Sequence, residues 1–196
     1  MIIAKTIKTI RATLFIASVI VFSNVSAQDS SSNNLYKVNI EKALLDSNVN
    51  SYFKQVYYKN QIISGDDSVM LSITDSLFSS ESQYHAFYFM VFTRSMNGAD
   101  GFYSEALGFA AMEFLETHTL EFVNYFNSLA LLDSSDLRNW ANCVYGEIQL
   151  SSEENELEAI SNLKKTLSMN ISENLEAQRG LITQLIEMLL IINSEG

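Results

Sequence analysis

The densest apolar stretch of the chain runs from Tyr84 to Met96. At 3.6 residues per turn, its apolar side chains cover every face of a helix, and polar residues gather only near its end, at Thr93, Arg94 and Ser95. A helix that is apolar on all sides must be surrounded by other elements, and these thirteen residues are fewer than the roughly 20 that a membrane span needs. The pattern therefore predicts a buried central helix.

Signals at both ends of this stretch favour a helix over the alternative, a buried strand. Phe, Tyr and Val are common in strands, so the apolar run alone does not decide between the two. Ser80 and Gln83 match the Ser-x-x-Gln capping box that starts helices, and Asn97-Gly98 matches a helix stop. We expect the capping box to form and the helix to end at this glycine.

The rest of the chain repeats the same pattern of helical apolar spacing separated by short polar turns, and it contains no proline. The spacing predicts an all-α fold, with one domain of about eight antiparallel helices over residues 39–196. A compact bundle and a short HEAT-like helical-repeat arrangement both fit, because a spacing of about 35 residues per helix pair is present without a repeated motif. The predicted helices, apart from the central one, span residues 39–61 with a break near Ser47-Asn48, 69–78, 102–117, 119–131, 137–149, 151–167 and 172–192.

Small residues interrupt the bulky ones in the stretch 102–117, where Ala106, Gly108, Ala110 and Ala111 occur. Small side chains allow a neighbouring helix to approach closely. We expect this face to pack against the bulky central helix.

The first 27 residues have the pattern of a signal peptide. Lys5, Lys8 and Arg11 precede an apolar segment, residues 12–22, and Val25-Ser26-Ala27 forms a small-residue cleavage site. An uncleaved anchor is the alternative, although the apolar segment is shorter than the roughly 20 residues of a span. The pattern predicts cleavage near Ala27-Gln28 and export to the periplasm or the extracellular space. Residues 28–38 are predicted to be a disordered polar lead-in, and no later segment is long enough to span a membrane.

The charge of the processed chain is strongly negative and uneven. After removal of residues 1–27, 9 Lys and Arg oppose 23 Asp and Glu, a net charge of −14. Residues 60–137 alone sum to −10, with Arg94 as their one basic residue. Such a balance disfavours nucleic acid and anionic lipid as partners, and it is compatible either with simple solubility or with attraction of a cationic partner. The candidate partner-binding residues are Asp66, Asp67, Asp75, Glu105, Glu113, Glu116 and Glu121.

The sequence carries no motif of a catalytic, cofactor or metal site. Cys143 is the only cysteine, so no internal disulfide can form, and its place three residues after Trp140 predicts a buried, unreactive thiol. His85 and His118 have acidic neighbours but lack metal-ligand spacing. The Gly-x-Ser-x-Gly, P-loop and Gly-x-Gly-x-x-Gly motifs are absent. We therefore assign no catalytic residue, no metal ligand and no cofactor.

The leading hypothesis is an exported all-helical binding protein without catalytic activity, whose acidic surface meets a basic protein partner. One alternative is a hydrolase that uses carboxylates with His118 or His85. Another is a structural subunit of an envelope assembly. The identity of the partner and the oligomeric state stay open at this stage.

Overall fold

The all-α prediction is confirmed by the structure, a computed structural model that describes residues 35–152, 155–172 and 175–195. Every regular element in these ranges is helical. A first helix covers residues 35–45. It is followed by α2 (Ser51–Lys59), α3 (Asp67–Ser76), a 3-10 turn (Ser82–Tyr84), α4 (His85–Ser95), α5 (Gly101–Thr117), α6 (Thr119–Ser128), α7 (Ser134–Ser151), α8 (Glu156–Met169) and α9 (Glu176–Glu195).

Only part of the N-terminal region for which the sequence makes predictions belongs to the described residues. The signal peptide at residues 1–27 and the first part of the polar lead-in, residues 28–34, lie outside the described residues. Residues 35–38, the last part of the predicted lead-in, are helical in the structure. The predicted break near Ser47 is confirmed, since the first helix ends at residue 45 and α2 begins at Ser51.

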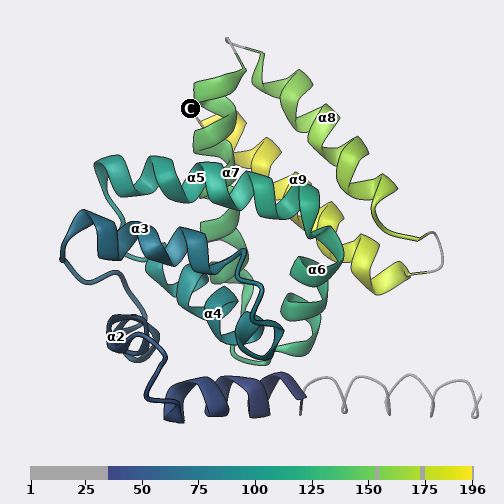
Figure 1. Cartoon of the computed structure of the whole chain (residues 1–196). Coiled ribbons are helices and arrows are strands. Elements are labelled where there is room, and N and C mark those ends of the chain that lie inside the picture. The colour runs from purple at the N-terminus through teal and green to yellow at the C-terminus, as the bar shows by residue number, and fades with distance from the viewer. Residues whose placement is uncertain (1–34, 153–154, 173–174, 196) are drawn as a thin grey trace, which may run out of the picture.

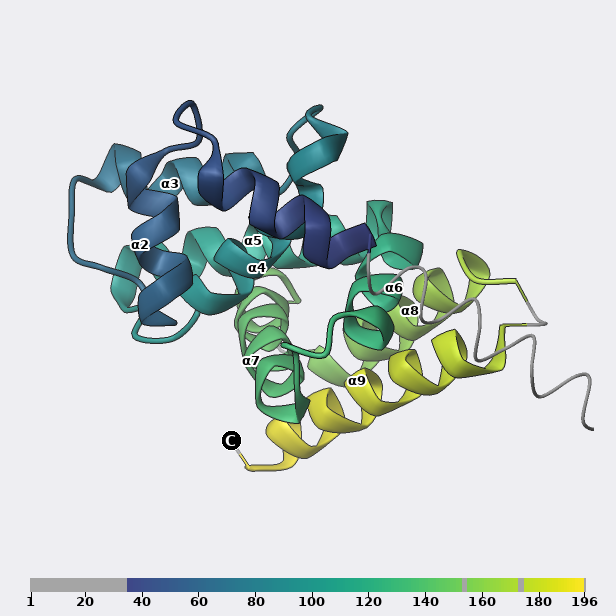
Figure 2. The ribbon, with the colours of Figure 1, turned by 90° about the horizontal axis from the view of Figure 1, so that it is seen from below.

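The helices form a compact arrangement in which segments far apart in the sequence pack together (Figure 1). Helix α4 packs on α2, α3 and α7, and α9 packs on α6, α7 and α8. The first helix lies along the outside and reaches α6, where the ring centroids of Tyr36 and Tyr125 are 5.1 Å apart (Figure 2). Units of a helical repeat contact only their neighbours, so the contact of the first helix with α6, which is several helices further along the chain, favours the compact bundle over the HEAT-like arrangement.

The central helix is enclosed as predicted. Eight of the eleven residues of α4 are buried. Phe89 stacks on Trp140 of α7 with ring centroids 5.2 Å apart, and it also meets Phe114 of α5 and Tyr125 of α6. Helix α4 therefore joins the surrounding helices through one aromatic cluster. Within the described part of the chain, no helix is both long and apolar enough to span a membrane.

The predicted capping box at the start of the central helix is wrong. The chain enters α4 through the 3-10 turn, and neither Glu81, which precedes that turn, nor Tyr84 makes a side-chain capping bond. The Tyr84 amide is satisfied instead by the Glu81 carbonyl at 2.8 Å. A backbone turn thus replaces the side-chain cap that the Ser80-x-x-Gln83 pattern suggested.

Gly108 of α5 meets a different neighbour from the one predicted. Gly108 faces α7, where a Cβ atom added to it would lie 2.9 Å from the Cys143 carbonyl oxygen. Figure 1 shows α7 crossing behind α5. Because Gly108 has no side chain, the α5 backbone can approach the α7 backbone closely. The α5 and α7 pair is the most extensive helix contact of the described chain.

A hydrogen bond between Tyr84 and Asp46 ties the chain after the first helix to the central helix, and it predicts a pH effect. The Tyr84 hydroxyl donates to Asp46 Oδ2. This bond holds the pKa of Asp46 below its ordinary value and raises the pKa of Tyr84 to about 12. Because the pKa of Asp46 is lower in the folded chain than in the unfolded one, its ionisation stabilises the fold above about pH 4, and this contribution is lost as the pH falls through the lowered pKa.

We therefore expect Tyr84→Phe to lower the free energy of unfolding at neutral pH, with a difference from wild type that shrinks below about pH 4. Urea titrations followed by circular dichroism at several pH values measure this. Tyr145→Phe is the matched control, because the Tyr145 hydroxyl donates to the neutral Asn193 Oδ1 at 3.1 Å. A constant loss in both variants from neutral to acid pH would contradict the role given to Asp46.

Candidate functional site

The outer face of α5 combines exposed aromatic and acidic side chains. Phe102 and Phe109 are 59% and 63% exposed, and the three glutamates between and after them are exposed as well. Their spacing places all five on one stripe of the helix. We call this stripe the α5 ridge, and it consists of Phe102, Glu105, Phe109, Glu113 and Glu116.

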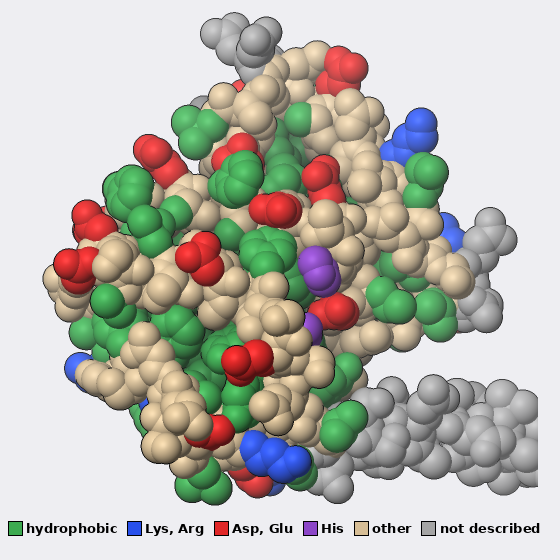
Figure 3. All heavy atoms as spheres, viewed as in Figure 1, with side chains coloured by type: hydrophobic (Ala, Val, Ile, Leu, Met, Phe, Trp, Pro, Cys, Tyr) green, Lys and Arg blue, Asp and Glu red, His purple; other side chains and the backbone are tan. Residues whose placement is uncertain are grey.

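The surroundings of the α5 ridge carry little positive charge. Figure 3 shows acidic and apolar side chains interspersed over the face that α3 and α5 present, with Lys and Arg toward its edges. Among the described residues, ion pairs within 4.0 Å occur only between His85 and Glu121 and between Arg138 and Glu195. The carboxylates of the α5 ridge therefore have no Lys or Arg partner within this part of the chain.

Arg94, the one basic residue among residues 60–137, is engaged elsewhere. Its guanidinium lies 3.9 Å from the centroid of the Tyr57 ring and donates a hydrogen bond to the Tyr57 carbonyl oxygen. Its charge is thus held in a half-buried contact with α2 and leaves the ridge carboxylates unneutralised.

Three of the predicted partner-binding residues lie on or before α3, which packs against α5. Asp67 shares a small hollow of about 90 Å³ with Phe102 and Tyr103 at the start of α5. Asp66 caps α3 by accepting from the Ser68 amide at 2.8 Å, and the Ser68 hydroxyl and amide lower the pKa of its carboxyl. Asp75 is exposed on α3. Asp66 therefore has a structural role, whereas Asp67 adjoins the α5 ridge.

The remaining predicted residue, Glu121, lies apart from the ridge on α6. It is half-buried, and its Oε2 is 3.9 Å from Nδ1 of His85. The structure therefore brings Glu105, Glu113 and Glu116 together on α5, whereas Glu121 lies on α6. Glu121 meets this group only at a hollow of about 400 Å³, which Glu116 and Glu121 both line.

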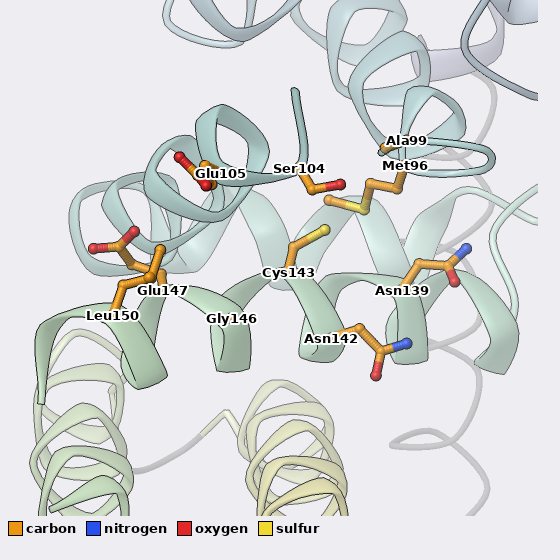
Figure 4. Close-up of a pocket in the computed structure, with 10 residues that line it drawn as sticks. All are labelled: Met96, Ala99, Ser104, Glu105, Asn139, Asn142, Cys143, Gly146, Glu147 and Leu150. Carbon is orange, nitrogen blue, oxygen red and sulfur yellow. The ribbon is translucent and has the colours of Figure 1, made fainter. Parts of the chain in front are cut away.

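A further opening lies between α5 and α7, and we call it the α5–α7 groove (Figure 4). Its volume is about 410 Å³. Its apolar lining includes Met96, Cys143 and Leu150, and Gly146 leaves room where a side chain would otherwise stand, since a Cβ there would meet nothing within 4 Å. Its polar lining consists of Ser104, Glu105, Asn139, Asn142 and Glu147.

Cys143 in this groove is unsuited to nucleophilic catalysis. Burial raises the pKa of its thiol to about 12, so the thiolate is scarce at neutral pH. Figure 4 shows its sulfur directed toward Ser104 and Met96, with no histidine among the residues around the groove. The unreactive thiol that the sequence predicts is supported by this environment, although Cys143 is half-buried and lines the groove.

His118 lies against Thr117 and Phe114. The Thr117 hydroxyl donates to the Glu113 carbonyl oxygen at 2.6 Å and lies 2.7 Å from His118 Nδ1. The His118 ring stacks on Phe114 with centroids 4.9 Å apart. In the described ranges, no group of three or more His, Cys, Asp or Glu could hold a metal ion.

Comparison of the chain with protein-family models, with curated proteins and with solved structures finds no match.

The exposure of the two phenylalanines and the groove were not predicted from the sequence. The ridge has a detectable signal, because Phe102, Glu105, Phe109 and Glu113 follow one another at helical spacing and mix two residue types on one face. The groove has no comparable signal. It depends on how α5 crosses α7, and that crossing is a tertiary feature.

Proposed function

We propose that this protein is an exported helical binding protein without catalytic activity, and that its α5 ridge engages a basic, amphipathic segment of a protein partner. The observation that carries the proposal is the α5 ridge itself, where three carboxylates without a basic partner in the described residues alternate with two exposed phenylalanines. A segment that alternates arginine with an apolar residue complements both groups.

The physical basis combines two forces of different range. The charge of −10 over residues 60–137 attracts a cationic segment from a distance and raises its association rate. At contact, Phe102 and Phe109 offer apolar area and ring faces, and an arginine near a ring face gains a cation–π interaction of about 0.5–1 kcal/mol at an exposed site. Charge thus selects and steers the partner, and the aromatic side chains hold it.

The export component of the proposal is supported by the signal-peptide pattern of residues 1–27, which lie outside the described residues. A strongly acidic surface also suits a protein that must stay in solution after secretion.

The test uses a synthetic peptide in which arginine alternates with leucine, and it removes the ridge charges by the triple change Glu105→Gln, Glu113→Gln and Glu116→Gln. We expect binding at about 50 mM salt to weaken about tenfold, because three exposed charge pairs at roughly 0.5 kcal/mol each sum to the free energy of one decade. At about 500 mM salt the difference is expected to be much smaller, because the charges are screened. Titration calorimetry or fluorescence anisotropy measures both affinities.

The matched control removes the same number of charges elsewhere, by Glu158→Gln, Glu176→Gln and Glu187→Gln on the exposed faces of α8 and α9. It is expected to weaken binding far less. The pair Phe102→Ala and Phe109→Ala is expected to weaken binding at both salt concentrations, because apolar contact is not screened. Equal loss in the two triple variants would show that net charge alone matters and would contradict the α5 ridge as the binding surface.

A further inference from the structure

The α5–α7 groove opens beside the α5 ridge and shares one residue with it. Glu105 belongs to the ridge and also lines the groove. A segment that lies along the ridge therefore passes the mouth of the groove. Across from Glu105, α7 contributes Glu147, whose Cβ packs 3.5 Å from the position that a Gly108 side chain would take.

The lining of the groove suits a long side chain with a cationic end. Glu105 and Glu147 supply carboxylates, and both lie toward the same end of the groove in Figure 4. Neither takes part in an ion pair within the described residues. Between that end and Asn139, Figure 4 places the sulfur of Cys143, which with Met96 forms an apolar wall.

Arginine matches this lining better than lysine does. Its guanidinium carries five N–H donors in a flat fork, which can bond to two carboxylates at once, and its methylene stem is apolar. The Asn139 amide, on the other side of Cys143 from the two carboxylates, is held in place because its Nδ2 donates to Asn97 Oδ1 at 2.9 Å. The volume of about 410 Å³ is ample for one side chain.

We propose that the α5–α7 groove takes an arginine side chain of the basic partner, with the guanidinium held by the carboxylates of Glu105 and Glu147. The proposal rests on the proposed function for the source of that arginine. It adds that the partner is recognised by one inserted side chain as well as by the charge of the ridge.

Cys143 allows a direct test, because it is the only cysteine and lines the groove. Its thiolate attacks a methanethiosulfonate reagent, forms a mixed disulfide and releases methanesulfinate. We expect cationic aminoethyl methanethiosulfonate to react about tenfold faster than anionic sulfonatoethyl methanethiosulfonate, after each rate is divided by its rate with a small free thiol. The small thiolate fraction of Cys143 lowers the rates of both reagents by the same factor, so their ratio reports the local charge. Mass spectrometry follows the reaction.

Two variants locate the effect in the groove. Glu105→Gln with Glu147→Gln is expected to bring the rate ratio close to one without changing the shape of the groove. Gly146→Leu is expected to slow both reagents, because its side chain extends into the open space at Gly146. Gly180→Leu on α9 is the control, since a Cβ there also meets nothing within 4 Å but lies outside the groove.

Protection completes the test. L-arginine methyl ester is expected to slow the modification of Cys143 by a neutral reagent, methyl methanethiosulfonate, whereas L-citrulline methyl ester, which has the same α-amino group but an uncharged side chain, is not. Equal rates for the cationic and anionic reagents, or equal protection by the two esters, would overturn the groove proposal. If the arginine and leucine peptide still binds the ridge in that case, the proposed function stands. If the peptide fails to bind while the cationic preference is present, the proposed function fails and the groove remains an arginine site.

Discussion

Replacing Trp140 by alanine is expected to lower the free energy of unfolding by about 3–5 kcal/mol. Trp140 is fully buried, and its ring contacts Phe89, Phe92 and Phe122 with centroids 5.2, 5.1 and 4.9 Å away. These contacts link α7 to α4 and α6. The truncation would leave a cavity at the place where these helices meet, and a domain of ordinary stability has only about 5–15 kcal/mol to lose.

Chemical denaturation followed by circular dichroism measures this loss. A second variant isolates the polar part of the site, because Trp140 Nε1 donates to Thr93 Oγ1 at 3.0 Å in the buried core. Thr93→Val leaves that indole N–H without an acceptor, and we expect a loss of about 1–3 kcal/mol, whereas Thr93→Ser keeps the acceptor and should lose less. Phe109→Ala, at an exposed position, should stay within about 0.5 kcal/mol of wild type. A Trp140→Ala chain as stable as Phe109→Ala would refute the central aromatic cluster.

The second large effect is expected at Gly108, where alanine should destabilise the fold by about 1–3 kcal/mol although alanine favours helices. The added Cβ would lie 2.9 Å from the Cys143 carbonyl oxygen, and a backbone atom of α7 cannot move aside as the end of a side chain can. Helices α5 and α7 would have to separate, which would loosen the most extensive helix pair of the described chain.

Two other helical glycines provide matched controls for Gly108→Ala. Gly146 and Gly180 have nothing within 4 Å of an added Cβ. Gly146→Ala and Gly180→Ala should each raise the free energy of unfolding by about 0.5–1 kcal/mol, because alanine loses less backbone entropy on folding. If all three variants were stabilised alike, α5 and α7 would not approach as closely as the structure has them.

The elements that the sequence predicts well are those with strong local periodicity. The helix from Tyr84 to Met96 is enclosed as expected, because a segment that is apolar on every face has no other stable environment in water. Helix α7 begins at Ser134, close to the predicted start at residue 137, because Asp133 forms a capping box with Asp136.

The contacts between helices and the grouping of side chains on the surface were harder to predict from the sequence. Gly108 shows that a small residue signals a close approach without naming the neighbour, since it meets α7 and not the central helix. The carboxylates were identified by composition alone, and only the fold shows that Glu105, Glu113 and Glu116 share an exposed face while Glu121 does not. Phe102 and Phe109 illustrate the same limit, because a phenylalanine in a helix is normally expected to be buried.

The position of α9 has a consequence for how the chain matures. Helices α6, α7 and α8 all pack against α9, and Ile182, Leu185, Ile186 and Leu189 of α9 are buried in that contact region. During synthesis these three helices emerge before their shared partner does. The apolar sides that these helices turn toward α9 can be covered only after α9 has been synthesised, so this part of the core is completed last.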